Sequence, residues 1–207
     1  PQDLEGGRGR VPGNIAILGV LKVVLPDEKK ALLVLQVNFI GAIEFDKKRA
    51  WFFANIFESR ILFITIEGEI GVLLAWGDDP NFVISVGGFH PAFKAPPLPF
   101  PEPRRITLSI LNTDYARIRV EGYFAVTSNT VQFGANVELF FGFDALKIEG
   151  QLSFDALFRV PPLYFIITIS ASLSVKVGVL DYSVSVSVGH WKGRHLGAPP
   201  VRALFLC

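Results

Sequence analysis

The sequence predicts an all-β fold, and three observations lead to this prediction. Long apolar runs recur, and two of them read ALLVLQVNFIGAIEF at residues 31–45 and ILFITIEGEIGVLLAW at residues 61–76. Short polar tips such as 46–48 and 128–129 separate the runs, and such short connections join antiparallel neighbours because parallel strands need long crossovers. No segment shows the period of a helix. We therefore predict an antiparallel meander that forms either a sandwich or a strongly curved open sheet.

The strand candidates follow one another along the whole chain, with turn residues between them. Some runs alternate cleanly, since Val131, Phe133 and Ala135 are interleaved with Gln132 and Asn136. This alternation is typical of a sheet with one face in water. The candidates lie at residues 14–24, 31–45, 49–57, 60–76, 82–88, 105–112, 115–127, 131–142, 145–154, 163–178 and 180–188.

The N-terminal half differs from this pattern, because the runs 31–45 and 61–76 are largely apolar on both sides. Strands of this kind need cover on both faces. A Pro-rich connection at 89–105 joins the two halves, and repeated Pro excludes both a helix and a central strand. Because it also contains Phe89, Phe93 and Phe100, we expect it to lie across the sheet rather than to act as a solvated linker.

These patterns predict three regions along the chain. Residues 1–13 read as a flexible N-terminal segment, which is polar and rich in Gly. Residues 14–188 form a single β-rich domain, with the Pro-rich connection inside it. Residues 189–207 read as an irregular, basic tail.

Composition narrows the functional classes. The formal net charge of +1 gives no field that would attract nucleic acid, so we expect no nucleic-acid partner. Half of the residues are hydrophobic and the mean hydropathy is +0.42, yet no stretch of about 20 residues is apolar enough for a transmembrane helix. Because the chain contains no Met, we expect it to be a segment of a longer protein. The sequence does not assign a cellular compartment.

The polar residues form no recognisable catalytic set. His90 precedes Pro91 in a turn, which favours a hydrogen-bonding corner residue. His190 and His195 are five residues apart, and the one Cys is the terminal Cys207, so the ligands of a zinc site are not assembled. We therefore expect no enzyme, no bound metal and no cofactor.

Several motifs point to a family. They are GGFHPAF at 87–93, YFAVTSNTVQFGANVE at 123–138, and FDAL at 143–146 and again at 154–157. Together they resemble a family of large, β-rich, chiefly bacterial proteins known only as a domain of unknown function. The resemblance covers about residues 30 to 188 and implies long chains of repeated β-strands without an established activity. We expect each FDAL to mark a turn, in which Asp accepts backbone hydrogen bonds.

The favoured function is a non-catalytic structural or interaction module, with neighbouring β segments or further copies of the chain as partners. The alternative is a carrier of an apolar ligand such as a lipid in a groove of the sheet. A third hypothesis is an outer-membrane β-barrel, which ranks lower because the expected lumen faces are not polar. For the carrier we expect a cavity lined by Phe39, Phe53, Phe63 and Leu74, with Glu67 and Glu69 at its polar rim.

Overall fold

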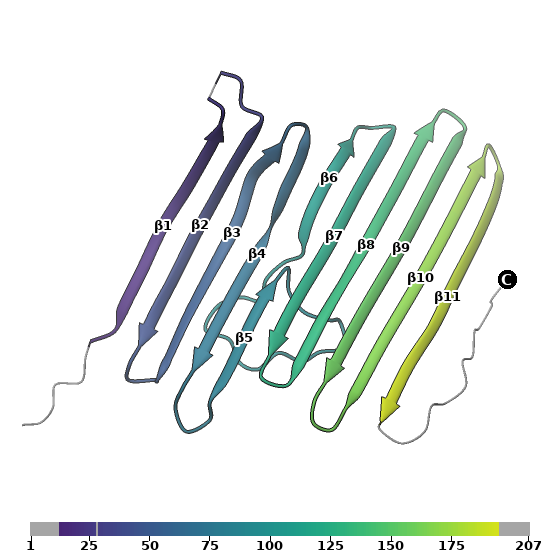
Figure 1. Cartoon of the computed structure of the whole chain (residues 1–207). Helices are drawn as coiled ribbons and strands as arrows, with labels where there is room; N and C mark the ends of the chain where they lie inside the picture. The colour runs from purple at the N-terminus through teal and green to yellow at the C-terminus, as the bar shows by residue number, and fades with distance from the viewer. Residues whose placement is uncertain (1–12, 28, 195–207) are drawn as a thin grey trace, which may run out of the picture.

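The structure is a computed structural model that describes residues 13–27 and 29–194, with the backbone alone for 187–194. All regular secondary structure in this part of the chain is β. Eleven antiparallel strands form one sheet, and Figure 1 shows them side by side in a single broad layer. The predicted all-β meander is thus confirmed. Of the two predicted architectures the chain adopts the open sheet, because β1 and β11 lie at opposite edges.

Each predicted strand is present, although some boundaries differ. β3 continues beyond its predicted end at residue 57 as far as Ile61, and β9 continues beyond its predicted end at residue 154 as far as Arg159. The strands are β1 (Ile15–Leu25), β2 (Leu33–Glu44), β3 (Arg49–Ile61), β4 (Ile64–Ala75), β5 (Asn81–Val86), β6 (Ile106–Asn112), β7 (Ala116–Thr127), β8 (Thr130–Phe143), β9 (Leu146–Arg159), β10 (Tyr164–Val177) and β11 (Leu180–Arg194).

Consecutive strands are neighbours throughout the sheet, with one exception. The short strands β5 and β6 share the place between β4 and β7, so each of them pairs with both. The chain between them, residues 87–105, leaves the plane of the sheet. This arrangement gives the Pro-rich segment its position in the middle of the molecule.

The pairing register divides the side chains between two faces, because successive residues of a strand point in opposite directions. We call one the covered face, since residues 87–105 lie on it, and the other the apolar face. The covered face includes Trp51, Phe53, Leu73, Val83, Tyr123, Ala125, Gln132 and Asp155. The apolar face includes Ile17, Phe39, Phe52, Val72, Ile84, Phe124, Phe133, Phe154, Ile169 and Val184.

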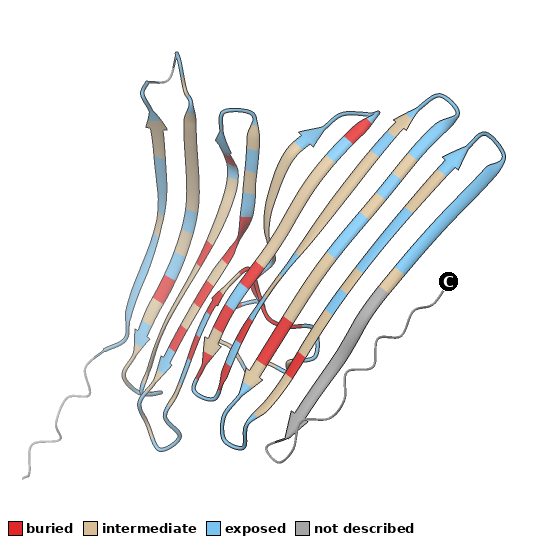
Figure 2. Cartoon of the chain, turned by 45° about the vertical axis from the view of Figure 1, so that its right-hand side comes forward, coloured by how far each residue is buried: buried red, intermediate tan, exposed pale blue. Residues whose placement is uncertain are grey.

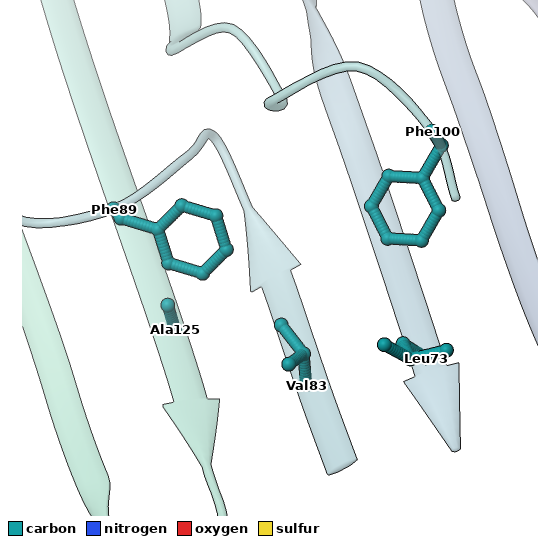
Figure 3. Close-up of a cluster of buried hydrophobic side chains, with 5 residues drawn as sticks. All are labelled: Leu73, Val83, Phe89, Phe100 and Ala125. Atoms are coloured by element: carbon teal, nitrogen blue, oxygen red, sulfur yellow. The ribbon is translucent and has the colours of Figure 1, made fainter. Parts of the chain in front are cut away.

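The core lies between the covered face and the Pro-rich segment. Phe89 and Phe100 of the segment pack on Leu73, Val83 and Ala125 of three central strands (Figure 3). Val83 and Ala125 are fully buried, and Figure 2 shows that buried residues gather on the central strands. Burial of each Phe side chain contributes about 1.5–3 kcal/mol. The aromatic residues of the segment thus bury themselves on the sheet, as the sequence predicts.

Two predictions need correction. Residues 189–194 were expected to be irregular, but β11 continues to Arg194, because a shift in its register with β10 near Ile169 accommodates the extra residues. The first FDAL forms the predicted turn, with Asp144 at a φ of 46°. The prediction of a turn at the second FDAL is wrong, because residues 154–157 lie inside β9 and pair with both β8 and β10. Residues 1–12 and 195–207 lie outside the described residues.

Candidate functional site

The apolar face has no charged side chain along the described strands from Ile15 to Val186. Wherever the register fixes the direction of a charged residue, as for Lys22, Glu69 or Lys176, that residue lies on the covered face. The side chains of Ser59 and Tyr182 are the polar exceptions in this stretch. The Ser59 hydroxyl is buried and accepts a hydrogen bond from the backbone N–H of Gln36 at 2.8 Å. The face is therefore apolar from one edge of the sheet to the other.

Much of this face is accessible to solvent. Leu152 is 53% exposed, Phe124 47% and Ile84 42%. The sheet is ten strand positions wide, and with strands ~4.8 Å apart and about 12 residues long its area is on the order of 2,000 Å². The largest apolar patch of a typical soluble monomer is about 300–600 Å². The apolar face is much larger than that.

Aromatic rings follow one another across the C-terminal part of the apolar face. The ring centroid of Phe133 lies 5.7 Å from that of Phe154 and 6.1 Å from that of Phe158, and Phe158 lies 6.4 Å from Phe165. Such pairs add about 0.5–1.5 kcal/mol beyond the burial of their area. They also hold the rings in place as a flat apolar layer over β8, β9 and β10.

The N-terminal part of the apolar face holds a shallow pocket of about 310 Å³. Its lining comes from β1 to β4 and is almost entirely apolar. This volume is at the lower end of what small-molecule sites offer. The lining residues on the apolar face are Ile15, Ile17, Ile43, Ala50, Phe52, Val72 and Leu74. Ala42 and Trp51 also border the pocket, although the register points their side chains to the covered face.

The four apolar residues predicted to line a cavity do not come together in the structure. Phe39 and Leu74 lie on the apolar face, and Leu74 lines the shallow pocket. Phe53 points to the covered face, where its ring stacks on Phe100 at 5.8 Å. Phe63 lies in the turn between β3 and β4 and is 71% exposed. The strand that contains Phe53 is apolar on both sides, so the sequence of this strand does not show to which face Phe53 points.

The two predicted rim residues lie together on the covered face, as their alternation predicts. Glu69 is 6% exposed and fastens the Pro-rich segment to the sheet. Its carboxylate accepts hydrogen bonds from the backbone N–H of Arg104 at 2.9 Å and from Nε of Arg104 at 2.7 Å. Nδ2 of Asn55 donates to the same carboxylate at 3.3 Å. Glu67 is exposed and lines a polar cavity of about 830 Å³ rather than an apolar one.

Arg105 makes a second attachment that the sequence reasoning missed. Its Nη1 donates to the carbonyl of Gly87 at 2.9 Å, and its Nη2 donates to the carbonyl of Phe89 at 2.8 Å. The guanidinium also lies 3.9 Å from the ring centroid of Tyr123, in a cation–π contact. Gly87 has a φ of 79°, and a Cβ there would lie 2.4 Å from the carbonyl oxygen of Gly122. The Gly-Gly pair of the GGFHP motif was the signal for this close approach.

Tyr123 connects this attachment to the second FDAL motif. Its hydroxyl donates a hydrogen bond to Oδ1 of Asp155 at 2.8 Å. Burial, together with this carboxylate, raises the pKa of Tyr123 well above its ordinary value. Asp155 therefore stays in the middle of a strand because it has a buried partner, and this long-range contact is what the turn prediction lacked.

A buried polar network holds the start of the segment. The backbone N–H of His90 donates to Oε1 of Gln132 at 2.9 Å, and Nε2 of Gln132 donates to Oγ1 of Thr130 at 2.8 Å. Nδ1 of His90 accepts a hydrogen bond from the N–H of Ala92 at 3.0 Å. The prediction of a hydrogen-bonding corner residue is confirmed.

The described residues contain no group of three or more His, Cys, Asp and Glu side chains placed to hold a metal ion. The side chains of His190 and His195 and Cys207 lie outside that part. A search of the same residues found no helix with the length and apolar character needed to cross a membrane. On the covered face, the polar contacts of Glu69, Arg105 and Gln132 hold the Pro-rich segment in place, and the contact of Tyr123 with Asp155 joins β7 to β9.

Comparison with known proteins gives one match. No curated protein and no solved structure is similar to the chain. The model of a family of unknown function, DUF6603, matches residues 9–203. This match spans the whole described sheet, and the chain therefore belongs to the DUF6603 family.

Proposed function

We propose that the chain is a non-catalytic structural or interaction module, a segment of a longer β-rich protein that packs another β layer on its apolar face. The observation that supports this function most directly is the lack of charge across that face, from β1 to β11. When an apolar layer removes such a surface from water, the free energy falls by about 25 cal/mol per Å² of buried apolar area. The centre of the covered face already has its own layer, since residues 87–105 lie on β3, β4, β5 and β7.

The shape of the apolar face favours a layer over an enclosed ligand. Ligand sites are concave and bury most of their ligand, whereas this face is broad and its pocket is shallow. Sheets that pack face to face lie about 10 Å apart and interdigitate their side chains. The rows of half-exposed Leu, Ile and Phe side chains suit such packing.

A pair of matched double variants tests this function. Leu152→Asp with Leu173→Asp places two carboxylates on the apolar face, at positions that are 53% and 49% exposed. Gln151→Asp with Ser172→Asp places the same charges one residue away on the same two strands, but on the covered face. We expect the first pair to abolish most binding of a fluorescent apolar-surface dye and most self-association, and the second pair to change neither. Equal behaviour of the two pairs would contradict the function.

The second candidate function is a carrier of an apolar ligand such as a lipid, which the shallow pocket over β1–β4 favours. Protein purified without detergent would then release a stoichiometric lipid on extraction with organic solvent, detected by mass spectrometry. Leu74→Asp would remove that lipid because Leu74 lines the pocket, whereas Ala75→Asp on the opposite face would retain it. An extract free of lipid would exclude the carrier.

A further inference from the structure

The polar cavity of about 830 Å³ lies on the covered face, in the middle of the described sheet. Its floor is formed by side chains of β3, β4, β6 and β7, and its wall by the two ends of the Pro-rich segment, residues 88–89 and 102–105. Figure 1 shows β6 between β4 and β7, where the segment returns to the sheet. A volume of this size is in the range of small-molecule sites.

The wall of this cavity is fixed by the contacts that hold the segment. Arg104 pairs with Glu69 through Nε at 2.7 Å, and Arg105 donates to two backbone carbonyls at the start of the segment. At Gly88, which has a φ of 87°, an added Cβ would lie only 2.4 Å from the carbonyl oxygen of Pro103. The two ends of the segment therefore touch, and the cavity is preformed, which lowers the free-energy cost of binding a ligand.

A row of polar side chains crosses the floor of the cavity. The register places Thr107 of β6 opposite both Glu67 of β4 and Glu121 of β7, and with strands ~4.8 Å apart the two Glu residues are roughly 10 Å from each other. In the described part of the chain, the carboxylate of Glu67 and the hydroxyl of Thr107 have no hydrogen-bond partner. Glu67 is also exposed. These groups can therefore bind a ligand without breaking an internal contact.

The cavity presents charges of both signs. Its lining contains four carboxylates and three guanidinium groups. Nη2 of Arg119 pairs with Oε1 of Glu121 at 2.6 Å, whereas no described residue pairs with Glu102. An ion of either sign would meet groups of its own charge in this cavity, and such juxtapositions are unfavourable. The distribution of charge therefore favours a neutral ligand.

Two buried polar atoms in the lining have no partner among the described residues. One is Oδ1 of Asn55, an acceptor whose amide neighbour Nδ2 already donates to Glu69 at 3.3 Å. The other is Nε of Arg119, a donor. Native structures leave few buried polar atoms without a partner. The hydrogen-bonding capacity that remains in the cavity is thus of both kinds, donor and acceptor.

We propose that this cavity binds a neutral, hydroxyl-rich ligand, specifically an oligosaccharide. A hydroxyl group donates one hydrogen bond and accepts others, whereas a carboxylate only accepts and a guanidinium only donates. Hydroxyls of one sugar chain can therefore donate to Glu67 and Glu102 and accept from Arg119. The half-buried ring of Phe57 lies in the same lining and offers an apolar surface to the C–H groups of a sugar ring. The span of roughly 10 Å across the floor suits more than one sugar unit.

Binding of the fluorescently labelled whole chain to an array of neutral oligosaccharides tests this proposal. We expect binding to at least one of them, which isothermal titration calorimetry then measures for variants. Glu67→Ala removes a charged acceptor, so the dissociation constant should rise about 10- to 100-fold. Thr107→Val keeps the shape of the side chain and should raise the dissociation constant about 3- to 10-fold. Circular dichroism establishes that each variant keeps the β-sheet.

Glu149→Ala is the matched control, because Glu149 is an exposed carboxylate on the same face that lies outside the cavity. It should leave the dissociation constant unchanged. The affinity should also be nearly independent of salt concentration, since a neutral ligand has no charge to be screened. Spermidine serves as a cationic probe and should not compete with the oligosaccharide.

Three results would overturn the oligosaccharide site. They are an array on which no neutral member binds, an affinity that Glu67→Ala and Thr107→Val leave unchanged, and displacement of the oligosaccharide by spermidine. The Leu152→Asp, Leu173→Asp double variant, which tests the apolar face on the other side of the sheet, should bind the oligosaccharide as the wild-type chain does. The two proposals therefore fail separately.

Discussion

At the scale of single residues, the covering segment depends on a few buried polar contacts. Glu69 neutralises Arg104, and Asp155 orders the hydroxyl of Tyr123 beneath Arg105. A buried carboxylate without such partners would cost several kcal/mol. The buried charge of Glu69 therefore remains in an apolar run because the Pro-rich segment returns to pair with it.

The hydroxyl of Tyr123 makes the stability of the sheet sensitive to alkaline pH. Its pKa in the folded chain is raised above the ordinary value of 10.0, so the folded state holds the phenol proton where the unfolded chain releases it. This contribution of Tyr123 to the free energy of unfolding is complete below about pH 10 and is lost as the pH rises above that value. Tyr123→Phe removes the hydrogen bond to Asp155, and we expect it to cost about 1–3 kcal/mol at neutral pH.

Urea unfolding of both proteins at about pH 8 and about pH 11 measures this effect. The wild-type chain should lose more free energy of unfolding between the two pH values than Tyr123→Phe does. Tyr115→Phe is the control, because Tyr115 is 62% exposed. An equal loss in the wild-type chain and Tyr123→Phe would show that the phenol of Tyr123 does not cause the alkaline sensitivity.

The sequence predicted the face on which some polar residues lie, but not how deeply each one is buried. Glu67 and Glu69 stand out in the sequence because they interrupt an apolar run, and their common face follows from strand alternation. Which of them is buried does not follow, because the partner of Glu69 is 35 residues away. Phe63 is the opposite case, since it looks like a core residue but lies in an exposed turn.

At the scale of elements, the Pro-rich segment acts as a lid that fills the centre of the covered face. The ring of Phe100 lies over Gly71, where a Cβ would come within 2.4 Å of it, and beside Trp51 and Phe53. The absence of a side chain at Gly71 creates the space for this ring. Because residue 71 of β4 is Gly, the Pro-rich segment packs directly on the backbone of this strand.

Phe100→Ala measures how much this packing contributes. Phe100 is 8% exposed, and removal of a buried Phe ring costs about 3–5 kcal/mol. We expect a loss of that size in urea unfolding, whereas Pro97→Ala, at an exposed position of the same segment, should change stability by less than about 0.5 kcal/mol. A loss below about 1 kcal/mol for Phe100→Ala would mean that the segment lies loosely on the sheet.

The strands themselves were largely predictable because alternation and turn residues are local signals. The split between β5 and β6 was not, because two short strands occupy one place in the sheet only when residues 87–105 fold away from it. The second FDAL shows the same limit, since Asp155 favours a turn locally and is held in β9 by Tyr123.

At the scale of the whole molecule, the two-sided apolar runs of the N-terminal half have separate causes. β3 and β4 are apolar on both sides because the Pro-rich segment covers one face of them. β1 and β2 have no such cover in the described chain, and Ile40 of β2 is 43% exposed on the covered face. The sequence shows that cover is needed on both sides of these strands, but it does not show what supplies it.

The packing proposed for the apolar face accounts for one of these surfaces. A second layer on this face, which is itself on the order of 2,000 Å², would bury an area in the range of permanent assemblies rather than transient ones. On the covered face of β9, β10 and β11, the side chains of Gln151, Ser172, Ser183 and Ser185 are exposed to water. The proposed contact on one face, with water on the other, suits a structural layer, because this function requires only that each face keeps its composition.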